Sequence, residues 1–320
     1  MNRRLIPLAG ALAALQILVA CHTGPTPRFQ FGIVSDPWHV DDWARAVGAK
    51  PSFVMEFEPW SRLRTLDSHF AEARAKGLKA FMVTWEPWKP AGDARLAVQA
   101  TPQPAYSNLA IARGKWDRYI RTFADSVRRS GLTVYIRFAH EMNGYWYPWS
   151  WNEAEYVEAW RHIHDLFRQE GAANARFVWS VNSSLFQNDA TWLTVCRRFW
   201  PGPAYVDLVG MTLINFGGTK AHPVQMYVSR LELLHMAFAK PVFVTELKTA
   251  YEGRVRWLTD LRDWLAFTPS WMAGLTLSQG GPSYGQEQLG PIVGNVQWQL
   301  TDDPASRPIV KSIAQLAAGG

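Results

Sequence analysis

The feature that most constrains the fold of this chain is a regular alternation of short β-rich runs with amphipathic helical stretches. The β-rich runs predict strands at 29–35, 52–57, 79–85, 133–139, 175–181, 206–213, 241–245 and 272–278. Helical periodicity occurs near 40–47, 65–76, 115–130, 154–170, 191–199, 224–238, 252–266 and 304–317. Such alternation indicates parallel strands with helical crossovers. About eight such units close a barrel more naturally than they form an open sheet. We therefore predict an α/β fold, a single (β/α)8 TIM barrel.

Composition narrows the function classes. The 320 residues contain no Pro/Gly/Ser linker, charge run or internal repeat, so one folded domain is expected. The net charge of +6 is modest and no basic arm is clustered, so we expect no nucleic-acid partner. No Gly-x-Gly-x-x-Gly motif follows the first strand, and no cofactor is expected. The 17 tryptophans are abundant, and each can pack in a core or stack on a sugar ring.

Polar and aromatic residues collect directly after the predicted strands. The residues in strand order are Asp36-Pro37-Trp38, Glu56-Phe57-Glu58-Pro59-Trp60, Trp85-Glu86-Pro87-Trp88, His140-Glu141-Met142-Asn143-Gly144, Trp179 and Asn182 near the end of the fifth strand, Asn215-Phe216-Gly217-Gly218 and Glu246. The carboxyl ends of the strands are the face on which barrel enzymes build their active sites. A functional cleft at this end of the barrel is therefore predicted.

Two glutamates fit the chemistry of glycosidic bond cleavage. Glu141 follows the fourth predicted strand and Glu246 the seventh, each after an apolar run. Cleavage through a covalent intermediate needs one carboxyl group that protonates the leaving oxygen and one that attacks the anomeric carbon. In such enzymes the two groups lie about 5–5.5 Å apart, which side chains on facing barrel strands can reach.

The segment Arg137-Phe138-Ala139-His140-Glu141-Met142-Asn143-Gly144, continuing to Trp146-Tyr147-Pro148-Trp149, resembles the signature of glycoside hydrolase family 26. The resemblance extends from about Phe31 to the C-terminal helix and includes the motifs at 84–88, 114–120 and 205–210. This family contains β-mannanases, mixed-linkage β-glucanases and β-1,3-xylanases. The resemblance implies that Glu141 is the acid/base and Glu246 the nucleophile.

The resemblance also implies roles for two neighbours of the glutamates: His140 hydrogen-bonds near the nucleophile, and Trp146 lines the sugar site. Arg137 either lowers the pKa of a neighbouring carboxylate or forms a structural ion pair. The residues expected to contact substrate are His140, Arg137, Trp146, Asn143, Glu86, Trp85, Trp88 and Asn215. No metal is expected, because Asn143-Gly144 follows the His-Glu pair where a second histidine ligand would be needed.

Three positions depart from the family pattern. The chain has Ile214-Asn215 where the family commonly has Tyr-Asn, with the tyrosine bonded to the nucleophile. No aromatic residue occurs at 274–279, where the family usually has a tryptophan under the sugar ring. Leu247-Lys248-Thr249 replaces small residues, and Lys248 is expected to bring a positive charge close to the cleft.

The N-terminus predicts export. Two arginines precede an apolar stretch at 5–20, which is too short for a comfortable membrane span. The stretch ends in Leu18-Val19-Ala20-Cys21, which resembles the processing box of bacterial lipoproteins, where the cysteine carries the lipid. An ordinary signal peptide or an uncleaved anchor remains the alternative.

We accordingly expect a signal peptide at 1–20, a lipidated tether at 21–28 and a catalytic domain at 29–320. The only membrane contact would be the lipid on Cys21. Because His22 is not the aspartate of inner-membrane retention, an outer-membrane location is favoured. Cys196 is the only other cysteine, so no intramolecular disulfide is expected.

The expected function is retaining endo-hydrolysis of a β-linked polysaccharide by a monomer. Mannan, mixed-linkage glucan and a bacterial exopolysaccharide are the candidate substrates. Two alternatives stay open at this point: a glycan-binding protein with impaired catalysis, and a transglycosylase accessory to exopolysaccharide production.

Overall fold

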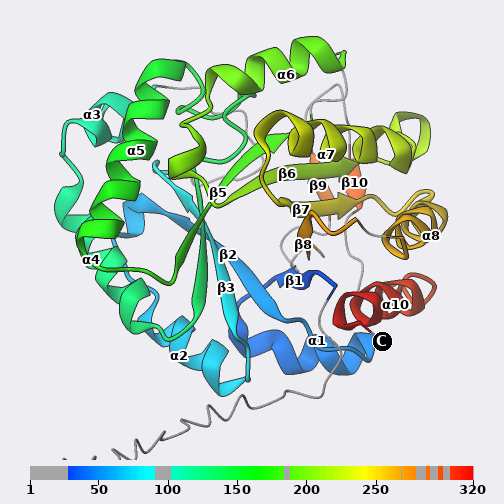
Figure 1. The fold of residues 1–320 in the computed structure, drawn as a ribbon. Helices are drawn as coiled ribbons and strands as arrows, with labels where there is room; N and C mark the ends of the chain where they lie inside the picture. The colour runs from blue at the N-terminus through cyan, green and yellow to red at the C-terminus, as the bar shows by residue number, and fades with distance from the viewer. Residues whose placement is uncertain are drawn as a thin grey trace, which may run out of the picture.

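The computed structural model describes residues 28–90, 102–183, 188–267, 269–278, 286–288, 295–297 and 303–319. Residues 1–27, with the predicted signal peptide and Cys21, lie outside the described residues. Eight parallel strands form a closed barrel in which each strand pairs with the next along the chain and β8 pairs with β1 (Figure 1). The strands are β1 (Gln30–Val34), β2 (Phe53–Pro59), β3 (Ala80–Glu86), β4 (Thr133–Phe138), β5 (Ala175–Asn182), β6 (Leu208–Asn215), β7 (Val242–Thr249) and β8 (Met272–Leu277). The predicted barrel and its eight strands are confirmed.

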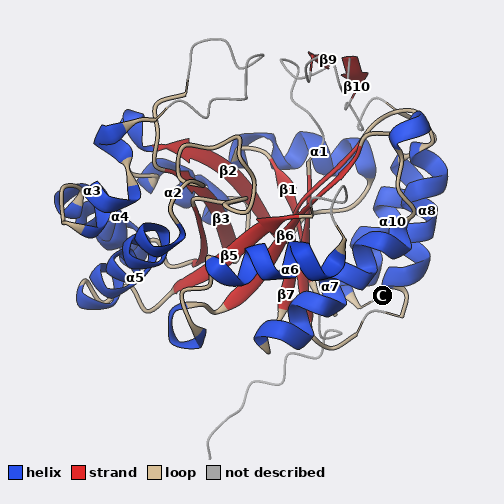
Figure 2. Ribbon diagram, turned by 90° about the horizontal axis from the view of Figure 1, so that it is seen from above, coloured by secondary structure: helices blue, strands red, loops and turns tan. Residues whose placement is uncertain are grey.

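Helices surround the strands on the outside of the barrel (Figure 2). They are α1 (Val40–Val47), α2 (Asp67–Ala75), α3 (Asn108–Ala112), α4 (Asp117–Arg129), α5 (Glu153–Gln169), α6 (Asp189–Arg198), α7 (Val224–Phe238), α8 (Arg254–Leu265) and α10 (Arg307–Ala318). The eight predicted helical stretches are all present, whereas the short α3 was not predicted. A separate antiparallel pair, β9 (Gln286–Gln288) and β10 (Asn295–Gln297), was not predicted either.

Local chemistry explains where several helices begin and end. The side chain of Asn152 accepts a hydrogen bond from the amide of Glu155 and caps α5, and Asn188 caps α6 in the same way through Thr191. Helix α1 ends at Gly48, whose φ of 77° is the left-handed conformation that closes helices most easily when no side chain is present. In the described part of the chain, no helix has the length and apolar character needed to cross a membrane.

Apolar side chains fill the amino-terminal half of the barrel interior. The inner cluster comprises Phe53, Met55, Ala80, Met82, Val178, Leu208 and Phe243. Gly32 is required beside it, since a Cβ there would lie 2.2 Å from the ring of Phe53. A larger apolar cluster fills the layer between the strands and the helices. Side chains on a strand alternate between its two faces, so the next inward residue lies two positions further along the chain. These next inward residues form a second layer, nearer the carboxyl ends of the strands, and this layer is polar.

Candidate active site

Arg137 occupies the centre of the polar layer. It is fully buried at the end of β4 and donates three hydrogen bonds to hydroxyl groups on β3, β5 and β6. The bonds run from Nε to Ser180 Oγ (3.0 Å), from Nη1 to Thr84 Oγ1 (3.1 Å) and from Nη2 to Thr212 Oγ1 (2.6 Å). Neutral hydroxyls hold the guanidinium in place without cancelling its charge. That charge is therefore available to a carboxylate above it.

A bulge in β7 turns Glu246 into the barrel. Val244 pairs with Met211 but Glu246 pairs with Thr212, so Thr245 is an extra residue in β7. Thr245 faces inward and bonds Ser180 (2.7 Å between hydroxyl oxygens), so strict alternation would point Glu246 outward. Instead Glu246 Oε2 lies 3.4 Å from Arg137 Nη1, inside the barrel. The bulge thus brings a buried carboxylate onto the buried arginine.

Glu141 is placed by an unusual stretch of backbone at the end of β4. Ala139 and Glu141 have φ of 41° and 55°, a left-handed conformation that costs about 1–2 kcal/mol for a residue with a Cβ. The amide of Glu141 donates to the carbonyl of Ser180 (2.8 Å), which ties this turn to β5. Strain of this kind persists only where the surrounding structure enforces it, and it is concentrated at functional sites.

Burial has the largest effect on the pKa of the Glu141 carboxyl group. Trp146 Nε1 donates to Glu141 Oε2 (2.9 Å), and the side chains of Thr212 and Asn182 also bond this carboxyl group. Burial raises the pKa of Glu141, the charge of Glu246 raises it further, and Arg137 opposes both. Burial therefore favours the protonated form of Glu141.

A third carboxyl group, Glu86, lies at the end of β3 in the same cluster. Trp88 Nε1 donates to its Oε2 (3.2 Å). Burial raises the pKa of Glu86 to about 8, although the Trp88 hydrogen bond and Arg137 act in the opposite direction. At neutral pH Glu86 is mainly a neutral acid that can donate a hydrogen bond.

His140 is buried between Glu141 and the aromatic residues that follow it. Its Nε2 lies 3.0 Å from the hydroxyl of Tyr147, and Tyr147 stacks on Trp149 with the ring centroids 4.3 Å apart. Burial holds the pKa of His140 well below its usual value, and the nearby charges of Arg137 and Lys248 lower it further. His140 is thus a neutral imidazole.

Lys248 adds a second cation at the nucleophile position. Its Nζ lies 3.5 Å from Glu246 Oε1, on the other oxygen from the one that faces Arg137. The expectation that Lys248 brings positive charge to the cleft is confirmed by this distance. Among the described residues, no group of three or more His, Cys, Asp or Glu side chains is arranged to hold a metal ion.

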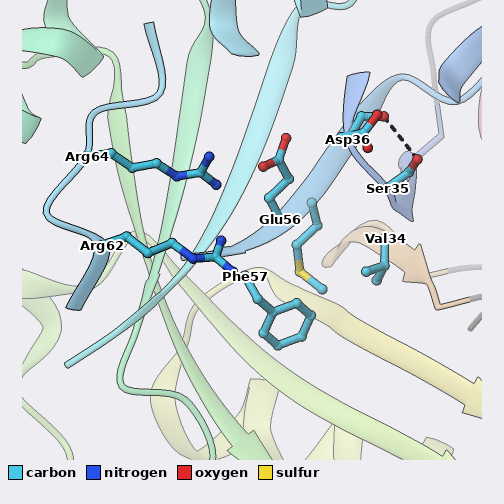
Figure 3. A pocket seen from close by; sticks show the side chains of 8 residues that line it. Val34, Ser35, Asp36, Glu56, Phe57, Arg62 and Arg64 are labelled. Atoms are coloured by element: carbon cyan, nitrogen blue, oxygen red, sulfur yellow. Dashed lines mark hydrogen bonds between the residues drawn. The ribbon is translucent and has the colours of Figure 1, made fainter. Parts of the chain in front are cut away.

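A pocket opens beside this cluster at the carboxyl ends of β1 and β2 (Figure 3). Its lining residues are Val34, Ser35, Asp36, Met55, Glu56, Phe57, Arg62 and Arg64. Figure 3 shows Arg62 and Arg64 extending from one side, with Asp36 and Ser35 on the other. The ring of Phe57 also contacts His140, with centroids 5.9 Å apart, so the pocket borders the carboxyl cluster.

Comparison with known proteins now decides the family. The family model described as glycosyl hydrolase family 26 matches residues 59–249, which is more than half of the chain. The chain belongs to glycoside hydrolase family 26. The matched range contains Glu86, Arg137, Glu141, Glu246 and Lys248.

Relatives of this family 26 chain include proteins named as an endoglucanase, a mannan endo-1,4-beta-mannosidase and a beta-1,3-xylanase. Endoglucanase H of Acetivibrio thermocellus is 30% identical over 228 residues, which cover 67% of this chain and 23% of that protein. A mannan endo-1,4-beta-mannosidase of Caldalkalibacillus mannanilyticus is 29% identical over 126 residues, 34% of this chain and 23% of that protein. The chain thus matches about a quarter of the length of these curated relatives.

Solved structures support the family 26 fold. A double mutant of the Cellulomonas fimi endo-beta-1,4-mannanase superposes with a TM-score of 0.62 at 16% identity, covering 89% of this chain and 70% of that one. A family 26 β-mannanase of Bacteroides ovatus gives a TM-score of 0.55 at 16% identity, covering 89% and 87% of the two chains. At these identities the likeness concerns the barrel.

Five of the residues expected at the family 26 site lie in or beside the carboxyl cluster. Glu86, Trp88, Arg137, His140 and Trp146 contact the cluster or one another. Trp88 packs edge-on against Tyr147 and Trp149. The hydrogen bond found for His140 goes to Tyr147, whereas its Nδ1 has no partner among the described residues. The expected bond near the nucleophile is therefore replaced by one to the aromatic wall.

Trp85 does not reach the cleft, and the prediction that it contacts substrate is wrong. Thr84 faces the barrel interior, so its neighbour Trp85 faces outward. There Trp85 is fully buried, stacks on Phe123 of α4 (4.6 Å) and donates to the hydroxyl of Tyr119 (3.1 Å). It is a core residue between sheet and helices.

Asn143 and Asn215 brace loops, and their amide groups are already engaged. Asn143 both donates to the carbonyl of Asn182 (2.9 Å) and accepts from its amide (2.7 Å). Asn215 donates to Thr249 (3.1 Å) and accepts from the amide of Gly217 (3.3 Å). Both residues therefore stabilise loops at the site, and their direct contact with substrate stays a prediction.

The hydroxyl residues around Arg137 were not singled out from sequence. Ser, Thr and Asn are common in any chain, so residue type alone carries no signal. Thr84, Ser180 and Thr212 could have been found by strand alternation, because each occupies an inward-facing position on a strand that ends beside the glutamates.

Proposed function

We propose that this family 26 chain is a retaining endo-hydrolase of a β-linked polysaccharide, with Glu246 as nucleophile and Glu141 as acid/base. The observation that carries the proposal is the contrast between two buried carboxyl groups in one cluster. Two cations lie beside Glu246, whereas burial raises the pKa of Glu141. When two neighbouring carboxyl groups have surroundings that differ in this way, the group whose protonated form is favoured is assigned as the acid and the other as the nucleophile.

The reaction follows from these two settings in two displacements. Glu141 gives its proton to the glycosidic oxygen while Glu246 attacks the anomeric carbon, and the bond to the leaving sugar breaks. The anionic Glu141 then takes a proton from water, which attacks the anomeric carbon and releases Glu246. Inversion twice gives a product with the same anomeric configuration as the substrate. Trp146 supports the first step, in which Glu141 becomes a carboxylate, because its N–H stabilises that form.

Two surface features near the carboxyl cluster support endo action. The pocket at β1 and β2 offers room for further sugars beside the cluster. After β4, near the proton donor, Tyr145 and Trp151 are 66% and 60% exposed. Exposed aromatic rings of this kind can stack on sugars of a long chain. The names of the relatives, endoglucanase and mannan endo-mannosidase, place glucans and mannans first among the substrates to test.

The test is a pair of isosteric substitutions, Glu141→Gln and Glu246→Gln, assayed on β-mannan, mixed-linkage β-glucan, β-xylan and bacterial exopolysaccharides. Each change removes one role in proton transfer or covalent catalysis and should lower kcat by at least about 10²–10⁴-fold without unfolding the protein. Glu153→Gln, on the surface of α5, is the matched control and should leave kcat unchanged. Proton NMR of the first product should show the β-anomer.

Two outcomes would favour the other interpretations. Calorimetric binding of a glycan without release of reducing ends would indicate a binding protein with impaired catalysis. Products longer than the substrate, formed only with an acceptor sugar, would indicate a transglycosylase acting in exopolysaccharide production. Full activity of Glu246→Gln would contradict the nucleophile assignment itself.

We also propose that the barrel is exported and held at a membrane by a lipid on Cys21, with the outer membrane favoured. The support is the Leu18-Val19-Ala20-Cys21 box after a short apolar stretch. Such an anchor would hold the enzyme near extracellular or periplasmic polysaccharide as a tethered monomer.

A further inference from the structure

Among the described residues, the two most exposed large apolar side chains lie at the end of the barrel opposite the cleft. Phe267, between α8 and β8, is 86% exposed, and Met236, in the last turn of α7, is 70% exposed. The other exposed large apolar residues follow the carboxyl ends of strands or lie in the first turn of the next helix, on the side where a glycan binds. A glycan in the cleft cannot cover Phe267 or Met236.

Met236 and Phe267 belong to one region of the surface. His235, the neighbour of Met236, stacks on the ring of Trp271 with the centroids 5.1 Å apart. Trp271 lies four residues after Phe267, and its carbonyl accepts a hydrogen bond from the first residue of β7 (2.9 Å). The last turn of α7 and the loop before β8 are therefore packed side by side.

This end of the barrel is also basic. From three residues before each strand to the second residue of that strand, the chain holds one carboxylate, Asp207, and five cations: Arg28, Lys50, Lys79, Arg176 and Lys240. Arg28 donates to the carbonyl of Ala266 (2.9 Å) and Lys240 to the carbonyl of Pro203 (2.8 Å). A carbonyl does not neutralise a cation, so both charges contribute to the field of this surface. Such a field attracts anionic partners.

The chain enters the barrel beside the same region. The carbonyl that Arg28 bonds belongs to Ala266, the residue before Phe267. Seven residue steps separate Arg28 from Cys21, and a chain spans at most about 3.6 Å per residue, so a lipid on Cys21 would lie within about 25 Å of Arg28. A membrane that holds this lipid therefore lies near the basic end of the barrel.

We propose that the amino-terminal end of the barrel rests on an anionic phospholipid surface, with Phe267 and Met236 as its apolar contacts; this rests on the lipid anchor on Cys21 proposed above. Exposed apolar side chains among Lys and Arg are the combination that binds the interface of an anionic membrane. Arg28 and Lys240 would contact the lipid phosphates beside Phe267. The cleft, at the other end of the barrel, would then face away from the membrane and toward polysaccharide.

Site-directed fluorescence measures this orientation. The full lipidated chain is reconstituted into vesicles of phosphatidylethanolamine with one quarter phosphatidylglycerol, and a nitroxide lipid serves as quencher. An environment-sensitive fluorophore is attached to Phe267→Cys, to Met236→Cys or to Tyr251→Cys, an exposed position after β7 on the cleft side. Cys196 is buried and lipidation consumes the thiol of Cys21, so the introduced cysteine reacts. Quenching should be at least about threefold stronger at 267 and 236 than at 251.

Charge variants test the anionic partner. Arg28→Gln combined with Lys240→Gln should lower the quenching at 267 at least about twofold, because two cations near the lipid phosphates are lost. Arg113→Gln combined with Lys115→Gln removes the same charge from exposed positions before α4, on the cleft side, and should change nothing. Added salt and vesicles of phosphatidylcholine alone should lower the quenching of the unsubstituted surface in the same way, even if the double variant folds poorly.

Other outcomes would overturn the inference. Equal quenching at 267 and 251 in a chain that carries fatty acid would contradict the orientation and leave the lipid anchor intact. Quenching at 267 that is indifferent to salt, to phosphatidylglycerol and to the double variant would show that the tether alone brings this end to the membrane. A chain that incorporates no labelled fatty acid would contradict the lipid anchor, and the docking inference with it.

Discussion

At the scale of single residues, three glutamates in one cluster have different electrostatic surroundings. Glu246 lies against Arg137 and Lys248, so its carboxylate is compensated by two cations. Glu141 and Glu86 are buried with weaker compensation, and burial raises the pKa of both. The residue type glutamate therefore does not determine the catalytic role. Desolvation and neighbouring charges decide whether the carboxyl group is suited to donate a proton or to act as a nucleophile.

The raised pKa of Glu86 predicts a pH dependence of stability. Between the ordinary value of 4.5 and about 8 the folded protein holds a proton on Glu86 that the unfolded chain has lost. Stability should therefore fall as pH rises through this window, by at most about 1.4 kcal/mol per pH unit. Glu86→Gln keeps the acceptor for Trp88 and removes the ionisation. The free energy of unfolding of Glu86→Gln minus that of wild type should grow from pH 4.5 to 8 and stay level outside that window.

Chemical denaturation at several pH values measures this difference. Glu153→Gln on the surface of α5 is the control and should show a nearly constant offset from wild type. A constant offset for Glu86→Gln across pH 4.5–8 would show that Glu86 is ionised in the folded protein.

At the scale of elements, strand phase decides which side chains reach the cleft. The bulge at Thr245 gives β7 two successive inward residues, so Glu246 reaches Arg137. Strand β3 has no such irregularity where it pairs with β4, so Thr84 faces inward and Trp85 outward. A run such as Trp85-Glu86-Pro87-Trp88 does not reveal from composition which of its aromatic residues faces which layer.

Substitutions of two tryptophans should separate these layers. Trp85→Ala should destabilise the protein by about 3–5 kcal/mol, because it leaves a cavity beside Phe123 and Tyr119. The milder Trp85→Phe should lower the melting temperature while kcat of the folded enzyme stays near wild type. Trp146→Phe removes the hydrogen bond to Glu141 and should lower kcat about tenfold or more, with little change in melting temperature.

Melting curves and kcat on a soluble oligosaccharide, measured for all three variants, test whether each tryptophan contributes to stability or to catalysis. If Trp85→Phe lost activity at unchanged stability, Trp85 would belong to the substrate site after all. If Trp146→Phe kept full activity, its N–H would not matter for the acid/base group.

At the scale of the whole molecule, the barrel closes without any residue before Arg28. The amide of Arg28 bonds the carbonyl of Ala317 at the end of α10 (2.9 Å), so both ends of the described barrel meet on one side. A lipid anchor at Cys21 would thus hold a complete barrel by a short tether. Localisation and catalysis should then be separable properties.

Replacement of the proposed lipidation site tests that separation. In the full chain expressed in a bacterium, Cys21→Ser should abolish incorporation of labelled fatty acid and move the protein from the membrane to the soluble fraction. Its kcat on a soluble oligosaccharide and its melting temperature should match those of wild type. Cys196→Ser, a change at a buried thiol, is the control and should leave membrane association intact. Unchanged fractionation of Cys21→Ser would contradict the lipoprotein proposal.

Much of the architecture was predictable from sequence because it is a local property. Hydrophobic periodicity within about ten residues distinguishes a strand from an amphipathic helix, and it located all eight barrel strands and their main helices. The prediction missed α3, which has only five residues, and β9 and β10, which have three each, because such short elements carry too little periodicity. The cleft was predictable too, since the carboxyl ends of parallel barrel strands always meet at one face.

By itself, the sequence determined the barrel, its closure and the end at which the glutamates gather. Only the tertiary structure decided that Trp85 is a core residue, that Asn143 and Asn215 brace loops, and that Lys248 lies on Glu246. The physical reason is the range of the interactions. Strand phase, burial and charge compensation at this site depend on pairs such as Arg137 and Glu246, which are 109 residues apart in the chain and 3.4 Å apart in the fold.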